Sequence, residues 1–431
     1  MKSARSSERE RIIGARTRPA GRLFHGWTIV VALGVTTVLA YGTNQYLYAL
    51  LLDPVAHETG WSRAALAGGF SGVVLVSGLA GVVAGPLVDR YGARLPLAAG
   101  SLLNALVLFL LSRTTSLAAW DALWTLGIGV GSALTYYPIT MTVVANWFVR
   151  QRPRALGVLT FMGAFSSTLT YPLAGLLIAR YGWRDALVAA AAAHLLVALP
   201  LHALVVRRRP EDFGLAPDGD AAAPLPHGAR DGPDGVALRA ALRTPAFWSL
   251  AVAFALAYFA STAILLQHVA YLIARGYAPQ AAASYVGLIG IAYIPGRIAV
   301  AAAGTRIPLG VALAAAFLLE AAGITALALA PSVAGVLAYV FAFGAAYGAT
   351  SPLRGAVVAR AFGRRSYGAI FGAQGVLVAL SSAAAPLVTA NVAARAGYAG
   401  AFLLCAAALV AAALALLPLA RARAADGAAA A

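Results

Sequence analysis

The sequence has 431 residues, of which 61% are hydrophobic and 11% charged, and its mean hydropathy is +0.80. Soluble globular domains carry roughly 25% charged residues, so this composition excludes an ordinary soluble protein and predicts a polytopic membrane protein. The formal charge of +17 comes from basic residues that lie between apolar blocks and not in one stripe, which argues against a nucleic-acid partner.

Residues 1–25 are rich in Arg and Ser, and the apolar block that follows is too long for a signal-peptide core. We therefore expect this block to remain as the first membrane helix. Cys405 is the single cysteine of the sequence, which excludes an intramolecular disulfide and a thiolate metal site. There is no nucleotide-binding glycine loop followed by lysine and no zinc-ligand spacing, so we expect no metal, no cofactor and no enzymatic activity.

Apolar runs of roughly 20 residues predict membrane-spanning helices. The sequence contains twelve, which predicts an all-α protein of two six-helix bundles joined by a Pro- and Asp-containing linker. The predicted spans are 26–51, 64–87, 95–112, 118–144, 155–179, 185–206, 246–273, 281–303, 308–330, 333–358, 367–393 and 399–420. The predicted parts are a tail (1–25), a first bundle (26–206), a linker (207–245), a second bundle (246–420) and a tail (421–431).

The basic residues predict the orientation of these helices. With the N-terminus inside, 24 of the 32 Lys and Arg residues fall in the tails and inner connections and six fall in the outer ones. Because positive charge gathers on the cytoplasmic side, we expect both termini to be cytoplasmic and the protein to lie in the cell inner membrane, in contact with the lipid bilayer. We expect it to function as a monomer.

Arg297 lies inside a predicted span, in the stretch Tyr293-Ile294-Pro295-Gly296-Arg297. A guanidinium in the bilayer costs about 2.5–3.5 kcal/mol, so it needs a partner, and no acidic residue lies within two turns. Two bundles with a site between them are the plan of secondary transporters. We therefore favour an anionic ligand over a structural pairing of Arg297 with a carbonyl or a helix dipole.

A motif follows the second predicted helix: Gly85-Pro86-Leu87-Val88-Asp89-Arg90-Tyr91-Gly92-Ala93-Arg94. It resembles the loop signature of the major facilitator superfamily, whose defining positions here are Gly85, Asp89, Arg90, Gly92 and Arg94. The resemblance implies that Asp89 meets the start of helix 11 near Tyr367 and closes the cytoplasmic side, since a carboxylate is attracted to the positive end of a helix. The alternative is a solvated loop whose arginines only set the topology.

Further stretches are similar to the bacterial monocarboxylate and oxalate/formate transporter group. In that group an arginine of helix 8 binds the substrate carboxylate, and the resemblance gives this role to Arg297. Animal monocarboxylate carriers have an acidic residue one turn earlier, where this sequence has Tyr293, so proton coupling by that route is not expected. The matching stretches are Leu52–Pro54, Gly60–Ala64, Asn146–Phe148 with Arg150, Arg152 and Arg154, Gly296-Arg297, and Ala361–Arg365.

Helices 1, 4, 7 and 10 line the pathway in this superfamily, which implies further substrate-binding candidates. Tyrosine hydroxyls and amides on these helices can hold a small acid, or can equally serve as interhelical hydrogen bonds. The candidates are Tyr41, Asn44, Gln45, Tyr136, Tyr347 and, on helix 11, Gln374. The candidates for proton coupling are His268 in the outer third of helix 7 and Glu320 near the middle of helix 9.

The leading hypothesis is a secondary transporter of small organic anions, of the lactate, pyruvate, formate or oxalate type. It would work by alternating access with proton symport or anion exchange. One alternative is an efflux pump for drugs or other small molecules within the same superfamily. Such a pump would be better served by a carboxylate inside helix 1 or 4. Another is a non-transporting membrane sensor or receptor, which usually carries an additional soluble domain.

Overall fold

The computed structural model describes residues 24–219, 235–303, 307–329 and 332–417, and these are almost entirely helical. The β pairing among them is an isolated bridge between Gly235 and Gly363. The predicted tail 421–431, nearly all of the tail 1–25 and linker residues 220–234 lie outside the described residues. The all-α prediction is confirmed for the part of the chain that is described.

Ten helical stretches in the described chain are long and apolar enough to cross a membrane. Two of them, Arg152–Val205 and Tyr367–Ala415, have 54 and 49 residues, about 70–80 Å at the rise of an α-helix, while a bilayer core is about 30 Å thick. Each contains one glycine with a left-handed backbone, Gly182 (φ 84°) or Gly397 (φ 72°), a conformation that other residues rarely adopt. Division at these glycines makes the structure consistent with the twelve predicted spans.

The first half of the chain forms one group of helices, the N bundle. The group is interrupted by four short π-helical segments, η1 to η4, and such segments are frequent at functional sites. Its elements are α2 (His25–Tyr41), η1 (Gly42–Tyr46), α3 (Leu47–Thr59), α4 (Arg63–Tyr91), α5 (Arg94–Arg113), α6 (Leu117–Ala122), η2 (Leu123–Ile128), α7 (Gly129–Thr135), α8 (Tyr137–Trp147), α9 (Arg152–Gly163), α10 (Phe165–Ala193), η3 (His194–Ala198) and η4 (Leu201–Val205).

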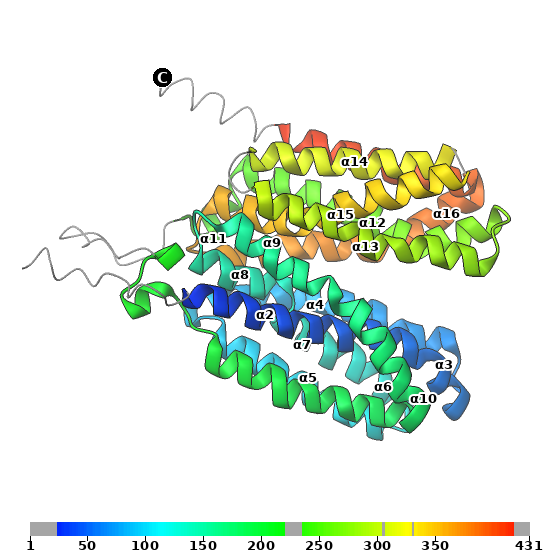
Figure 1. Ribbon diagram of the computed structural model, residues 1–431, viewed down its shortest axis with the longest axis horizontal. Helices are drawn as coiled ribbons and strands as arrows, with labels where there is room; N and C mark the ends of the chain where they lie inside the picture. The colour runs from blue at the N-terminus through cyan, green and yellow to red at the C-terminus, as the bar shows by residue number, and fades with distance from the viewer. Residues whose placement is uncertain (1–23, 220–234, 304–306, 330–331, 418–431) are drawn as a thin grey trace, which may run out of the picture.

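The second half forms another group, the C bundle, which lies alongside the first in Figure 1. Short helices of the linker stand between the two in the sequence. These are the 3₁₀ helices η5 (Pro210–Phe213) and η6 (Pro217–Gly219) and the α-helix α11 (Leu238–Ala241). The C bundle contains α12 (Pro245–Ala274), α13 (Pro279–Ala303), α14 (Leu309–Leu329), α15 (Val333–Phe362) and α16 (Tyr367–Ala415).

Several helices begin at a serine or threonine whose side chain accepts from a main-chain N–H three residues later. Ser62 accepts from Ala65 at 3.2 Å and Thr244 from Phe247 at 3.2 Å. Such caps satisfy donors that the first turn leaves open and contribute about 1 kcal/mol each. The sequence therefore marks these starts locally.

Two predicted boundaries differ from the structure. The first span continues as a helix to Thr59, and the second continues through Asp89 and Arg90 to Tyr91. The signature motif is thus the last turns of a helix and not a free loop, because the chain turns only at Gly92, whose φ is 85°. Polar residues at the ends of membrane helices extend the helix beyond its apolar core.

The two bundles meet most closely where α4 lies along α16. A methyl group on Gly85 would overlap the main chain of Gly368, and one on Gly81 would approach Gly372. Small residues permit this close approach of helix backbones. We call this end of the molecule, which includes Gly92, Trp147, Val206 and Gly363, the linker end; the opposite, far end includes Gly60, Thr114, Gly182, Gly276 and Gly397.

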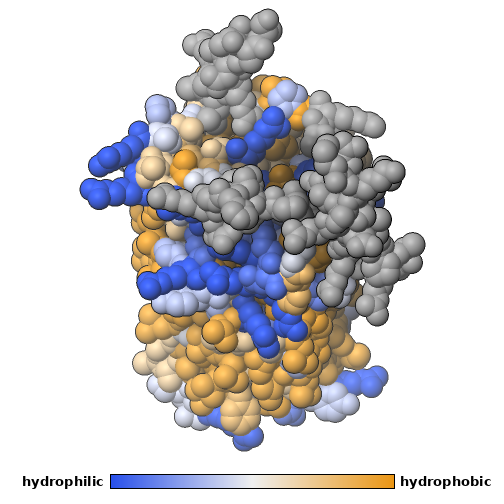
Figure 2. All heavy atoms as spheres, turned by 90° about the vertical axis from the view of Figure 1, so that its left-hand side faces the viewer, coloured by the Kyte–Doolittle hydropathy of each residue, from blue (hydrophilic) through white to orange (hydrophobic). Residues whose placement is uncertain are grey.

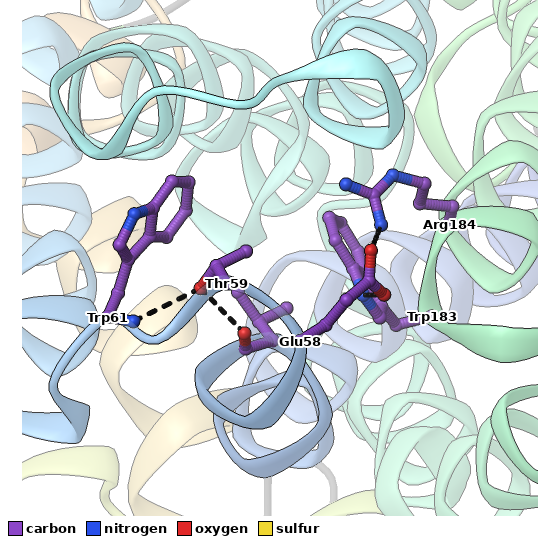
Figure 3. A network of polar contacts seen from close by, with 6 residues as sticks. Glu58, Thr59, Trp61, Trp183 and Arg184 are labelled. Atoms are coloured by element: carbon purple, nitrogen blue, oxygen red, sulfur yellow. Dashed lines mark hydrogen bonds and ion pairs between the residues drawn. The ribbon is translucent and has the colours of Figure 1, made fainter.

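The linker end is the hydrophilic end face seen in Figure 2, where polar residues gather across the middle and hydrophobic ones cover the flanks. At the far end of the N bundle, Glu58 accepts from Trp183 Nε1 at 2.6 Å and pairs with Arg184 (Figure 3). Since Glu58 lies in the last turn of α3 and Trp183 follows the break at Gly182, this network joins two segments that are distant in the sequence.

Candidate functional site

Arg297 lies on α13 at the boundary between the two bundles. Its guanidinium donates from Nη1 to the main-chain oxygen of Thr160 on α9, across the boundary, and the residue is 7% exposed. Ion pairs in the described chain join Arg184 to Glu58 and Arg364 to Glu211, and neither includes Arg297. Its Nε has no hydrogen-bond partner, so the structure holds a buried cation with an unused donor between its halves.

An aromatic cluster of the C bundle lies beside this guanidinium. The Tyr293 ring lies one turn away on α13, with its centroid 5.7 Å from Cζ of Arg297. Tyr347 of α15 packs against Tyr293 with ring centroids 5.3 Å apart and stacks on Phe343 at 5.7 Å. A cation near aromatic faces is stabilised without being neutralised, so Arg297 keeps its charge for a ligand.

Tyrosines of the N bundle approach from the other side. Tyr137 is hydrogen-bonded to the guanidinium of Arg297, and Tyr46 interacts with it electrostatically. Tyr41 stacks on Tyr136 with centroids 4.0 Å apart. The aromatic lining therefore comes from both halves of the chain.

A break in the fourth span positions two of these rings. Tyr136 has an extended backbone (ψ 177°) between α7 and α8, and Pro138 follows in the first turn of α8. Proline lacks the N–H that would bond to the carbonyl four residues earlier, and its ring clashes with that carbonyl, so it is accommodated in the first turn of a helix and the span divides before it. The break turns Tyr136 toward Tyr41 and leaves Tyr137 beside Arg297.

The predicted amide candidates occupy different surroundings. Asn44 is fully buried, donates to Ser132 at 3.1 Å and accepts from Thr43 at 3.0 Å, so its side chain is used inside the N bundle. Gln45 is half-buried on η1. Gln374 of α16 is fully buried, and neither of its amide atoms has a partner in the structure.

Glu320 lies fully buried on α14 in the C bundle. Ser261 of α12 lies 2.5 Å from its Oε1, and Oε2 has no partner. His268, two turns farther along α12, shares a hydrogen bond of 2.8 Å between its Nδ1 and the Tyr339 hydroxyl. Neither predicted proton-coupling residue is paired with a charged side chain of the described chain.

Asp89 contacts the start of α16, as the sequence resemblance implied. Its Oδ1 accepts from the N–H of Gly368 at 3.0 Å and its Oδ2 from Ala369 at 2.8 Å. A carboxylate at a helix N-terminus satisfies open donors and opposes the positive end of the helix dipole. This contact joins the bundles at the linker end.

The other residues of the motif support that contact in separate ways. Gly85 permits the close approach of α4 to α16, and Gly92 supplies the left-handed turn. The main-chain oxygen of Arg90 accepts from Arg208 of the linker at 2.8 Å, while the side chain of Arg94 is exposed.

The linker contacts both bundles at the same end. Asp218 accepts main-chain N–H groups of Val149, Arg150 and Gln151 at 3.1, 2.8 and 3.0 Å. Glu211 forms an ion pair with Arg364 at 2.9 Å. Burial lowers the pKa of the nearby Arg209 guanidinium, and the charges of Arg208 and Arg364 lower it further.

Arg354 is 6% exposed and lies among aromatic rings of the C bundle. Its Cζ is 4.3 Å from the ring centroid of Phe371 and 5.0 Å from that of Phe254. The structure encloses this cation, because neighbouring helices supply aromatic faces.

An apolar cavity of about 400 Å³ lies between α13, α14 and α15. Pro295 and Gly296 border it, but its walls carry no charged side chain. It therefore does not suit an anion, and the polar site lies with Arg297 at the bundle boundary.

Sequence reasoning did not identify Tyr46 or Tyr258 as members of the site. Tyr258 of α12 interacts electrostatically with Tyr41 and Tyr137 across the boundary. Both tyrosines lie on the first and seventh spans, where the resemblance placed pathway residues. Their position on these two spans was the only feature of the sequence that could have identified them, since a tyrosine in an apolar segment has no distinctive spacing.

Comparisons with known proteins agree with this arrangement. The sequence profile described as Major Facilitator Superfamily matches residues 33–319. Monocarboxylate transporter 13 of Bos taurus is 28% identical over 396 residues, which cover 88% of this chain and 87% of that protein. The oxalate:formate antiporter of Oxalobacter formigenes is 31% identical over 35% of this chain and 37% of its own length.

Solved structures share the fold. The human organic anion transporter MFSD10 superposes with a TM-score of 0.68 at 19% identity, covering 93% of this chain and all of that one. The fucose:proton symporter of E. coli gives 0.66 at 14% identity, covering 90% and 97%. At these identities the likeness concerns the fold alone. With a profile match over more than half its length and the two-bundle architecture described above, this chain belongs to the Major Facilitator Superfamily of membrane transporters.

Proposed function

We propose that this protein is a secondary transporter of small organic anions, with monocarboxylates such as lactate, pyruvate and formate, or the related oxalate, as substrates. The observation that carries the proposal is Arg297, a buried cation with no acidic partner in the described chain and an unused Nε donor. A planar guanidinium presents paired donors that fit a carboxylate. The relatives named monocarboxylate transporter and oxalate:formate antiporter support the same substrate class.

The aromatic lining favours a small substrate. Tyr137, Tyr46 and Tyr293 interact with the charge of Arg297. Further rings pack against these: Tyr347 on Tyr293, and Tyr41, which also stacks on Tyr136, on Tyr137. Tyrosine hydroxyls can hold the second oxygen of an acid while the rings exclude water. Gln374, whose amide has no partner, and Gln45 remain candidates for further polar contacts with the substrate. Asn44 would instead contribute indirectly, by holding η1 in place through its hydrogen bond to Ser132.

Transport would proceed by alternating access, with the linker end open to the cytoplasm in one state and closed in the other. Asp89 and its contact with α16 hold the closed arrangement in this proposal, and Arg90, Arg94, Gly85 and Gly92 shape that latch. Both termini would be cytoplasmic and the protein would reside in the inner membrane as a monomer. Coupling to protons or exchange against a second anion would supply the energy.

The test is uptake into proteoliposomes that contain the purified protein. Lactate, pyruvate, formate and oxalate are each supplied with and without an inward proton gradient, and again as counterflow against the same anion inside. We expect at least one monocarboxylate to be taken up, and uptake to fall to background in Arg297→Ala. Arg275→Ala is the matched control, since Arg275 also lies beside a tyrosine ring (5.2 Å from Tyr271) but at the far end.

Failure of every carboxylate to enter or compete would contradict the proposal. It would favour the alternative of an efflux transporter for other small molecules in the same superfamily.

A further inference from the structure

The C bundle buries one carboxyl group that the anion site does not use. Glu320 is fully buried in the middle of α14, and Ser261 of α12 is its hydrogen-bond partner. An ionisable side chain inside a membrane bundle is costly and is retained where it does chemistry. Its Oε2 has no partner, so the group is not locked into a structural network.

The hydrogen bonds at Ser261 identify which form of Glu320 fits. The Ser261 Oγ lies 2.8 Å from the main-chain oxygen of Ala257 and 2.5 Å from Glu320 Oε1. A hydroxyl has one hydrogen, so a single well-aligned hydrogen bond from Ser261 reaches one of these two acceptors. Both short contacts are satisfied when Glu320 carries a proton and donates to Ser261, while Ser261 donates to Ala257.

The groups that interact with Glu320 and that the structure identifies carry hydroxyls. Tyr293 of α13 and Tyr339 and Tyr347 of α15 interact with it electrostatically, and Ser261 represents α12. The ion pairs of the described chain, Arg184 with Glu58 and Arg364 with Glu211, do not include Glu320. Without an ion-pair partner in the described chain, the ionised form of Glu320 is costly in this buried place, which favours the protonated form.

Tyr293 connects this carboxyl with the anion site. Its ring lies 5.7 Å from Cζ of Arg297, and its hydroxyl interacts electrostatically with Glu320. A substrate carboxylate on Arg297 and an ionised Glu320 would place two negative charges in one bundle of low dielectric, where they repel. Binding of the anion and binding of a proton therefore favour each other, and the coupling is reciprocal.

A second pair lies between Glu320 and the far end. His268 is bonded to Tyr339 at 2.8 Å and is seven residues beyond Ser261 on α12, about 10 Å along the axis by helical rise. Tyr339 in turn interacts electrostatically with Glu320. His268, Tyr339 and Glu320 thus form a series of titratable groups that runs from the far end toward the buried carboxyl.

From these contacts we infer that Glu320, held by Ser261, is the proton-binding site of this transporter. The inference rests on the proposed function and deepens it by naming the residue through which a proton gradient would act on anion transport. On loading, the carboxylate of Glu320 takes up a proton and becomes a neutral acid; on release, the proton returns to water on the other side, and no other bond changes.

The experiment compares wild type, Glu320→Gln, Ser261→Ala and the control Thr325→Val in proteoliposomes. Thr325 is on the same helix and its hydroxyl bonds only to Ala321 at 2.8 Å, so its loss leaves the carboxyl untouched. Two assays are run with lactate: exchange at equal pH, and accumulation driven by an inward proton gradient, with a trapped pH dye reporting proton entry.

Glutamine imitates the protonated carboxyl but cannot release a proton. We expect Glu320→Gln to keep lactate exchange within about threefold of wild type and to lose gradient-driven accumulation and proton entry by more than tenfold. Ser261→Ala should shift the pH at which accumulation is half-maximal, and Thr325→Val should match wild type. Gradient-driven accumulation that survives in Glu320→Gln would overturn the inference, as would loss of exchange together with accumulation.

A second measurement does not need a substrate. Infrared difference spectra of the purified protein, wild type minus Glu320→Gln, should contain the carbonyl stretch of a protonated carboxylic acid, which disappears as pH is raised. Absence of that band at every pH would overturn the proton site. If no organic anion is transported but the band is present, the proposed function fails and the proton site stands, so the two failures are distinguishable.

Discussion

Arg297 of the C bundle donates a hydrogen bond to the main-chain oxygen of Thr160 in the N bundle. The same oxygen also accepts from the N–H of Ala164 at 3.1 Å, so the bond to Arg297 is an additional contact at the end of α9. The proposed anion site is thus placed where the two halves touch. A substrate that takes over donors of this guanidinium changes what holds the halves together.

Replacing Arg297 by Lys should raise the KM for the transported anion about tenfold or more, which corresponds to about 1.4 kcal/mol of binding free energy. Lysine keeps the positive charge but loses the planar fork that binds a carboxylate with two parallel hydrogen bonds. Initial uptake rates at increasing substrate concentration provide the measurement. Arg275→Lys at the far end should leave KM unchanged, and an unchanged KM in Arg297→Lys would count against bidentate binding.

Replacing Asp89 by Asn should weaken the closed arrangement of the linker end. The carboxylate accepts two main-chain hydrogen bonds from α16, and bonds to a charged group contribute about 1.5–3 kcal/mol each. An amide keeps one acceptor and loses the charge that opposes the helix dipole. Spin labels on cysteines introduced at the exposed Leu95 and Arg365, in a Cys405→Ala background, should report a larger fraction of long distances.

The control for that measurement is Asp212→Asn, since Asp212 is an exposed acid of the linker. Identical distance distributions for Asp89→Asn and Asp212→Asn would mean that the contact does not hold the end closed.

Replacing Gly85 by Ala should separate α4 from α16. The added methyl group would overlap the main-chain carbonyl of Gly368, which cannot move without shifting the helix, and such overpacking typically costs 1–3 kcal/mol. We expect uptake to fall severalfold or more and the unfolding temperature to drop. Gly375→Ala on α16 is the matched control, because a methyl group there meets no atom within 4 Å.

Replacing Asp218 by Ala should loosen the linker from the N bundle. Asp218 accepts three main-chain N–H groups before α9 and is 8% exposed, so its loss leaves buried donors unsatisfied at about 1–3 kcal/mol. Faster limited proteolysis of the linker would report the change. Asp218 has a φ of 65°, which glycine adopts without strain, so Asp218→Gly removes the acceptor without straining the backbone. If the lost hydrogen bonds cause the loosening, the linker of Asp218→Gly should be cleaved as fast as that of Asp218→Ala.

The far end should be insensitive to these four changes. The network of Glu58, Trp183 and Arg184 in Figure 3 lies at the opposite end from the linker and joins two segments of the same bundle.

Part of the site could be predicted because its residues are exceptional in their surroundings. An arginine in an apolar span needs a polar or anionic partner, so Arg297 was identifiable in the sequence. Asp89 was identifiable because it belongs to a recognisable motif at the end of a helix, where a carboxylate can bind the N-terminus of another helix. Tyr46 and Tyr258 were not, because a tyrosine between apolar residues is compatible with a bundle core, a membrane surface or a cavity wall. Asn44 also needed the structure, which places its amide against Ser132 inside the bundle.

Hydropathy and local chemistry alone determined that the chain is helical and crosses the membrane many times, since a backbone in lipid must satisfy its own hydrogen bonds. Only the tertiary structure decided which helices touch. It brought Thr160 to Arg297 and Gly368 to Asp89, and it set Ser261, Tyr293 and Tyr339 around Glu320. These partners come from segments far apart in the chain, and their meeting depends on how side chains of whole helix faces pack, which no local pattern encodes.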